Sequence, residues 1–98
     1  MTEVEPSPIK RRVEEHIARI VHDGKGEWIS YIGVAPREGL LLALAGVITL
    51  RHLEGAEETQ LYITMKNVPL GGKRYTVRVM KDAMYPVAAY DPHGEPIL

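Results

Sequence analysis

The side chains best suited to chemistry gather in one segment of the chain, from Thr59 to Lys81. This segment carries five cationic residues and no acid, whereas ten acids precede it and three follow it. Its cations are Lys66, Lys73, Arg74, Arg78 and Lys81, and its tyrosines are Tyr62 and Tyr75. Cationic groups can neutralise phosphates, and phenol rings can stack on bases. The segment therefore indicates a surface suited to single-stranded nucleic acid.

A β-hairpin is the element expected to position these side chains. Two runs of alternating residues, 57–67 and 73–81, flank residues 68–72, whose proline and paired glycines favour a turn. One alternating set is expected to pack under helices, and consists of Leu61, Ile63, Met65, Tyr75, Val77 and Val79. The other set is expected to point outward, and consists of Tyr62, Thr64, Lys66, Arg74, Thr76, Arg78 and Met80.

A further strand is expected at 27–34, because this stretch is rich in β-forming residues. Alternation sends Ile29 and Tyr31 to the outward face. The side chains expected to point inward are Trp28, Ile32 and Val34. A one-residue bulge would exchange the places of Trp28 and Ile29.

Three interpretations of the outward face are open. In the first it binds single-stranded nucleic acid, and Tyr62 and Tyr31 stack on bases. Phosphates would then be contacted by Lys66, Arg74 and Arg78, while Lys73 guides the strand at the loop. In the second, a homodimer buries the face, whose apolar members are Ile29, Tyr31, Tyr62 and Met80. In the third, the face is solvated and has no partner.

Residues that could support catalysis are sparse. The only serines are Ser7, which suits a helix cap, and Ser30, and neither lies in a nucleophile elbow. The Gly71-Gly72-Lys73 tract lacks the spacing of a phosphate-binding loop. We therefore expect a protein that is not an enzyme and has no cofactor.

Two smaller clusters have alternative explanations. Residues 91, 93 and 95 are Asp, His and Glu and could ligate a metal, but the sequence Asp91-Pro92-His93-Gly94 is typical of a type I turn. We favour the turn and predict no metal site. Residues 10–12 are cationic and begin a helix, where they could bind phosphate or be offset by nearby glutamates. We favour the offset.

The totals describe one small domain. The chain has 98 residues, a net charge of −1, 45% hydrophobic and 26% charged residues, and no cysteine. We expect residues 1–6 to be a flexible tail and 7–98 to be the domain. Without cysteine, a signal pattern or an apolar run of spanning length, a cytoplasmic location is expected. The lack of Phe and Cys resembles thermophile composition.

The remaining elements complete the predicted fold. Apolar residues recur at helical spacing from Ile9 until Gly24 provides a stop. Residues 36–53 favour a second helix capped at Gly55, although two strands turning at 45–46 are the alternative. Residues 85–90 are a short last strand, which Pro86 places at a sheet edge.

The order helix, strand, helix and three strands predicts an α+β fold. We expect a two-layer sandwich in which two helices cover one face of a four-stranded, mainly antiparallel sheet. The opposite face would then carry the outward residues of the hairpin.

Overall fold

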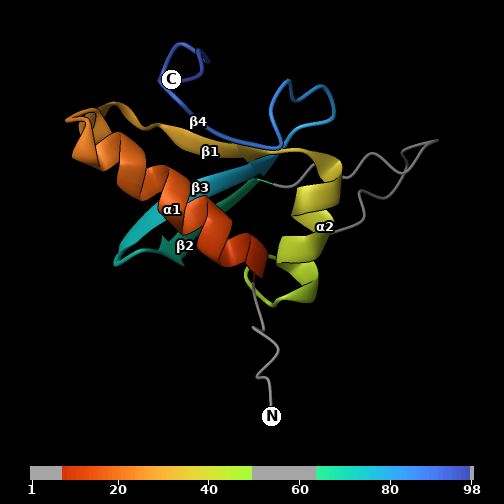
Figure 1. Cartoon of the computed structure of the whole chain (residues 1–98). Helices are drawn as coiled ribbons and strands as arrows, with labels where there is room; N and C mark the ends of the chain where they lie inside the picture. Colours follow the sequence, from red (N-terminus) through yellow and green to blue (C-terminus); the bar gives the residue numbers. More distant parts are fainter. Residues whose placement is uncertain (1–7, 50–63, 98) are drawn as a thin grey trace.

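The structure of the protein is a computed structural model that describes residues 8–49 and 64–97. The described elements follow the order that the sequence predicts, α-β-α-β-β-β, with one short 3₁₀ helix in addition (Figure 1). They are α1 (Pro8–His22), η1 (Gly26–Trp28), β1 (Tyr31–Val34), α2 (Pro36–Leu44), β2 (Thr64–Leu70), β3 (Lys73–Val79) and β4 (Val87–Tyr90). Neither described helix is long and apolar enough to cross a bilayer. The predictions made for residues 1–6, for strand residues 57–63 and for the side chains of Leu61, Tyr62 and Ile63 lie outside the described residues.

The four strands form one mixed sheet in the order β2-β3-β1-β4. Strand β3 pairs antiparallel with β2 and parallel with β1, and β1 pairs antiparallel with β4. Among the described strands, β4 neighbours β1 alone, and it begins directly after Pro86, which confirms the predicted edge position. The central place of β1 brings its residues beside those of both β3 and β4.

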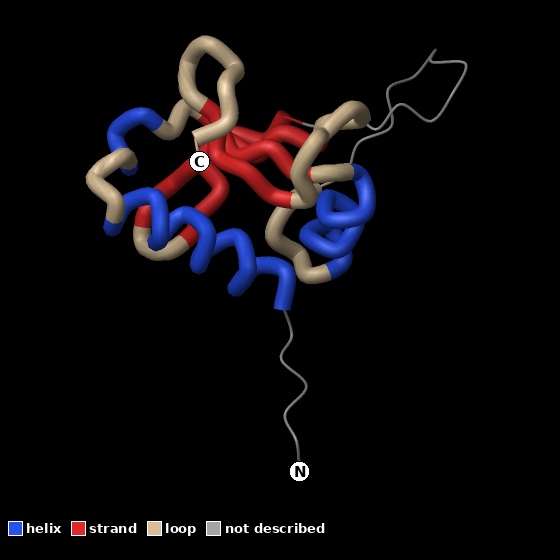
Figure 2. Tube along the Cα trace, turned by 45° about the horizontal axis from the view of Figure 1, so that its top comes forward, coloured by secondary structure: helices blue, strands red, loops and turns tan. Residues whose placement is uncertain are grey.

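Both helices cover one face of the sheet, which confirms the predicted two-layer arrangement (Figures 1 and 2). Helix α1 buries one stripe, and Leu42 of α2 joins the same cluster. Gly39 lets α2 lie close to the sheet, since a Cβ there would be 2.7 Å from Val79 Cγ2. The core residues of the strands are Ile32, Val34, Val68, Leu70, Val77, Val79 and Ala89. The opposite face carries no helix of the described part of the chain.

Both described helices end at a glycine in a left-handed conformation. Gly24 has φ +78° and follows α1, as predicted, with the Lys25 N–H bonded to the Ile20 carbonyl at 3.0 Å. Helix α2 ends at Leu44 instead of running to residue 53, so the predicted cap at Gly55 is wrong. Gly46, with φ +75°, closes α2 because its left-handed backbone lets the Val47 N–H reach the Leu42 carbonyl at 2.9 Å.

The segment before β1 differs from the predicted strand. Residues 26–28 form the 3₁₀ helix η1, and β1 begins only at Tyr31. The alternation of β1 therefore does not extend back to Trp28, whose side chain is 59% exposed although we expected it inward. Ile29, expected outward, is half-buried and packs against the core. A helical turn, rather than a one-residue bulge, reverses these two residues.

The hairpin of β2 and β3 turns more tightly than predicted. Val68 and Leu70 were assigned to the loop, but both are buried strand residues. The turn consists of Gly71 and Gly72, whose φ values of +60° and +88° match the two-residue turn that suits strand twist. A bulge between Met65 and Val68, with Asn67 at φ +61°, inserts one extra residue and lets both of them face the helices.

Candidate functional site

The candidate site is the face of the sheet opposite the helices, which we call the outer face. Alternation along β3 places Val77 and Val79 in the core and therefore Arg78 on the outer face. In β1 the buried core residues are Ile32 and Val34, so Tyr31 also belongs to the outer face. Alternation and the pairing registers also place on this face Gly33, Thr64, Pro69, Arg74, Thr76, Ala88 and Tyr90.

Three planar side chains form a stack across this face. The rings of Tyr31 and Tyr90 have centroids 5.1 Å apart and planes inclined by 9°. The guanidinium carbon of Arg78 lies 4.3 Å from the centroid of the Tyr31 ring. Because β1 lies between β3 and β4, Arg78 and Tyr90 approach Tyr31 from opposite neighbouring strands. The sequence of groups is therefore Arg78, Tyr31, Tyr90.

A glycine makes room for this stack. A Cβ at Gly33 would be 2.5 Å from Tyr90 Cε2 and 2.5 Å from Met80 Sδ, which no real side chain tolerates without a shift. Gly33 therefore lets Tyr90 and Met80 close over β1. Tyr90 is consequently only 5% exposed and forms the buried end of the stack.

The phenol of Tyr90 is neutral at neutral pH, as tyrosines ordinarily are, and its surroundings favour that form further. Burial raises the pKa of Tyr90, and the neighbouring Tyr31 and Tyr85 phenols add to the increase. A neutral ring beside Tyr31 places no negative charge near the Arg78 guanidinium. The contact between Arg78 and Tyr31 is therefore a cation–π interaction rather than part of an ion pair.

The stack changes the role expected of Tyr31. We predicted that this ring would stack on a base, but Arg78 and Tyr90 already lie on either side of it. Tyr31 is half-buried, whereas Arg78 is exposed. The accessible end of the stack is therefore the Arg78 guanidinium, and Tyr31 supports it.

The predicted cations are distributed over more than one side of the hairpin. Arg74 shares the outer face with Arg78, four residues and about 13 Å away along β3. Lys66 is exposed in the bulge of β2, next to the outer residue Thr64. Lys73 is exposed at the turn, but alternation assigns it to the side of Tyr75 and Val77 that the helices cover. Arg78 and Arg74 thus form the cationic part of the outer face, and Lys66 is exposed in the adjoining bulge.

Sequence reasoning did not select Tyr90 as a site residue. Its partner Tyr31 is 59 positions away, and only the register of β1 with β4 brings them opposite one another. On the outer face the neighbours of Tyr90 are small: Ala88 lies two residues before it in β4, and Gly33 adjoins it from β1 only through that register. Small neighbours of this kind leave space for a ring to lie flat.

The turn at 91–94 is confirmed as predicted. The Asp91 side chain accepts hydrogen bonds from the N–H groups of His93 and Glu95, both at 2.9 Å, and the Gly94 N–H bonds to the Asp91 carbonyl at 3.0 Å. Asp91 therefore holds the loop that adjoins Tyr31, since a Cβ on Gly94 would lie 3.8 Å from the Tyr31 hydroxyl. Residues 8–49 and 64–97 contain no cluster of three side chains that could hold a metal ion.

The arrangement offers a supported cationic plane beside two further cations. A guanidinium plane can stack on a base and also bond to phosphate oxygens. The chain matches no protein-family model, no curated protein and no solved structure.

Proposed function

We propose that this protein is a small, non-enzymatic, cytoplasmic module that binds single-stranded nucleic acid on the outer face of its sheet. The observation that carries the proposal is the stack of Arg78 on Tyr31 and Tyr31 on Tyr90. Bases of single strands stack on aromatic rings and on arginine planes, while cations along the groove contact phosphates. The stack supplies the plane, and the cationic neighbours supply the phosphate contacts.

The stack supports the proposal because it restrains a flexible side chain before any ligand arrives. An arginine free in solution loses much rotamer freedom when it is immobilised. Arg78 already rests on Tyr31, and Tyr31 is fixed by the buried Tyr90. A base that stacks on the exposed guanidinium therefore costs less ordering entropy than a base captured by an unsupported arginine.

The remaining cations are placed for a strand that runs along the hairpin. Arg74 lies about 13 Å from Arg78 along β3, so the two guanidinium groups would contact different phosphates. Lys66 is exposed in the bulge of the neighbouring strand β2. With three phosphate contacts, the logarithm of affinity should fall with the logarithm of salt concentration at a slope of about −2.

The homodimer remains a second prediction for this face, but the apolar area that would hold two copies together is smaller than expected. We expected Ile29 to contribute apolar area, but this side chain packs against the core. Tyr90 and Ala88 are buried within the chain itself. The outer face of the described residues therefore presents less apolar surface for a second copy than alternation alone suggested.

The test is fluorescence anisotropy with labelled single- and double-stranded oligonucleotides at two salt concentrations. Arg78→Lys keeps the charge and removes the plane, so affinity for single strands should fall roughly tenfold while the salt slope stays unchanged. Arg74→Gln should instead reduce the slope by about 0.7. Arg37→Lys in α2, on the helical side of the sheet, is the matched control and should bind normally.

Three outcomes would reject the proposal. They are failure to bind single strands at low salt, equal loss in the Arg37→Lys control, and full binding by Arg78→Lys. Sedimentation of the same samples tests the dimer separately. A dimer that dissociates when nucleic acid binds would show that both partners use one face.

A further inference from the structure

A second polar site lies away from the outer face, where α1 meets the start of β4. An open cleft of about 250 Å³ separates these elements. Its lining consists of Arg12, Glu15, His16, Arg19, Pro86 and Val87. Two guanidinium groups thus outnumber one carboxylate, and the strand side contributes no charged group.

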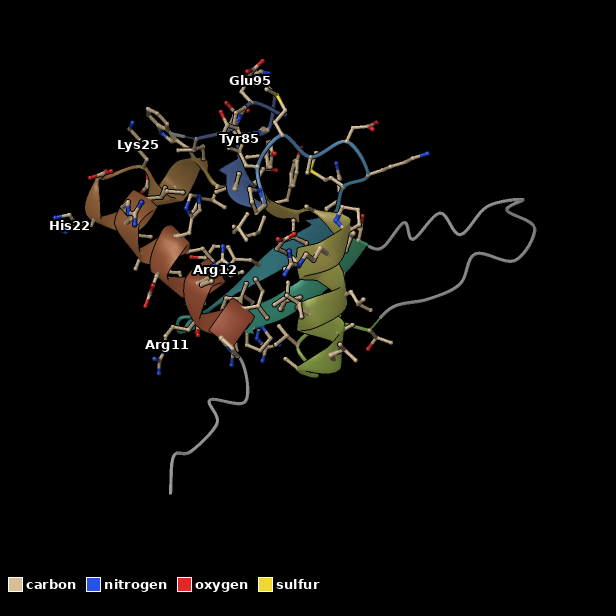
Figure 3. All side chains as sticks on the ribbon, turned by 45° about the vertical axis from the view of Figure 1, so that its right-hand side comes forward. Arg11, Arg12, His22, Lys25, Tyr85 and Glu95 are labelled. Carbon is tan, nitrogen blue, oxygen red and sulfur yellow. The ribbon has the colours of Figure 1, made fainter. Side chains whose placement is uncertain are left out.

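Helical geometry gathers the basic side chains of the cleft. Arg12, His16 and Arg19 are spaced by four and three residues, which places them on one side of α1 within about 10 Å of its length. Arg11, which adjoins Arg12 in sequence, leaves the helix in another direction (Figure 3). His16 therefore lies between two arginines that can both reach an object seated above it.

The His16 ring supplies an observation that the protein's own groups do not explain. Its Nε2 atom is buried and has no hydrogen-bond partner among the described residues. Buried polar atoms are nearly always paired, and an unpaired one calls for an explanation. Burial, and then the charge of Arg19, lower the pKa of His16, so the ring is neutral near neutral pH.

We propose that the cleft binds a tetrahedral oxyanion, that is a phosphate or sulfate group, between Arg12 and Arg19, with the half-buried His16 ring turning its Nε2 atom toward it. Guanidinium forks match the geometry of such oxygens. Nε2 has no exposed surface, so the ring must turn toward the cleft, where a protonated His16 would donate its Nε2 hydrogen to the anion and the atom would no longer be unpaired. Glu15 opposes the anion and sets an upper limit on affinity, because it is the one acid in the lining.

The site has a defined pH response. The charged groups facing His16 are Arg12, Glu15 and Arg19 on α1, while Pro86 and Val87 opposite carry none. A bound anion favours the protonated ring, so affinity should rise as the pH falls through and below 6.5, the ordinary pKa of histidine. Sulfate keeps its charge over this range, so a change in its affinity reports on the protein.

The experiment is a titration of the full chain with sodium sulfate at constant ionic strength, at pH 5.5 and 7.5, followed by NMR. We expect the His16 ring and Val87 amide signals to move, with tighter binding at pH 5.5. Arg12→Gln and Arg19→Gln should each weaken binding on the order of tenfold. His16→Gln should bind with no pH dependence, and its spectrum reports whether the variant folds.

Arg11→Gln is the matched control, since it removes the same charge from the same helix outside the cleft. If Arg11→Gln weakens sulfate binding as much as Arg12→Gln does, the anion is attracted only by the overall positive charge of the helix, and the proposal is overturned. An absence of NMR shifts at His16 and Val87 would overturn it as well. Inorganic phosphate and oligonucleotides with a 5′-phosphate or a 5′-hydroxyl then separate the sources of the group. If the oligonucleotide with a 5′-phosphate binds more tightly, the cleft recognises the end of a nucleic-acid strand. If both oligonucleotides bind equally and inorganic phosphate also binds, the cleft recognises small phosphorylated molecules.

Discussion

The rings of Tyr31 and Tyr90 lie nearly parallel on neighbouring antiparallel strands, with centroids 5.1 Å apart and planes inclined by 9°. This pair fixes the position of Arg78, which rests 4.3 Å above the centroid of Tyr31. The position of the cation therefore depends on two aromatic residues that need not touch a ligand themselves.

Removing the support should weaken binding without removing a charge. In Tyr31→Leu the guanidinium of Arg78 loses its cation–π contact and regains rotamer freedom, so affinity for single-stranded oligonucleotides should fall several-fold. Tyr31→Phe retains the ring and should bind normally. Anisotropy titrations of the two variants check this, and equal affinities would show that the stack has no part in binding.

The glycine beneath the stack should not tolerate a side chain. A Cβ at Gly33 would collide with Tyr90 and Met80, so Gly33→Ala should lower the free energy of unfolding by about 1–3 kcal/mol. Urea denaturation measures the change. Tyr90→Phe, which keeps the ring, is the milder control, and a stable Gly33→Ala protein would mean that Tyr90 can move aside at no cost.

The end of α2 should be sensitive to backbone conformation alone. Gly46 has φ +75°, and a Cβ added there would have no atom within 4 Å, so Gly46→Ala introduces strain without a collision. We expect a loss of about 1–2 kcal/mol in unfolding free energy. Gly46→Asn should lose less, because asparagine adopts left-handed conformations more readily, and an equal loss would contradict this origin.

Stability should fall in mild acid because of His16. Its pKa is lowered in the folded state by burial and by Arg19, so the unfolded chain binds the proton more tightly. The contribution is fully present above pH 6.5 and is lost as the pH falls from there toward the folded-state pKa. Thermal unfolding between pH 7.5 and 5 in chloride buffer should show a smaller decline for His16→Gln, and parallel curves would disprove it.

The fold could be predicted because its local signals agree. Pro8, Gly24, Pro36 and the glycine pair at 71–72 mark boundaries that the structure retains. Alternation in β3 correctly separated Val77 and Val79 from Arg78. Each of these signals depends on the backbone conformation of a few neighbouring residues, and contacts made elsewhere in the fold do not change it.

The predicted side-chain directions were wrong where an extra residue or a helical turn interrupts the alternation of a strand. Asn67 adds a residue to β2, which moves Val68 and Leu70 from the expected loop into the core. The 3₁₀ turn at Gly26–Trp28 reverses Trp28 and Ile29. Such insertions follow from tertiary packing, and periodicity in the sequence does not reveal them.

The stack was beyond sequence reasoning for a different reason. Tyr31 and Tyr90 meet only because β1 pairs with β4 in one particular register, and Gly33 clears the space between them. Composition showed that cations and phenols were present. Composition could not show that Tyr31 would support Arg78, or that Tyr90 would be buried on the other side of Tyr31.

The two borders of the sheet are closed against further strands. On the β2 side, the bulge at Asn67 and the missing N–H of Pro69 break the row of backbone groups that an incoming strand would need. On the β4 side, the chain folds back so that the Ile97 N–H bonds to the Ala89 carbonyl at 2.8 Å. Lateral growth into extended β-aggregates is thereby discouraged along the described strands.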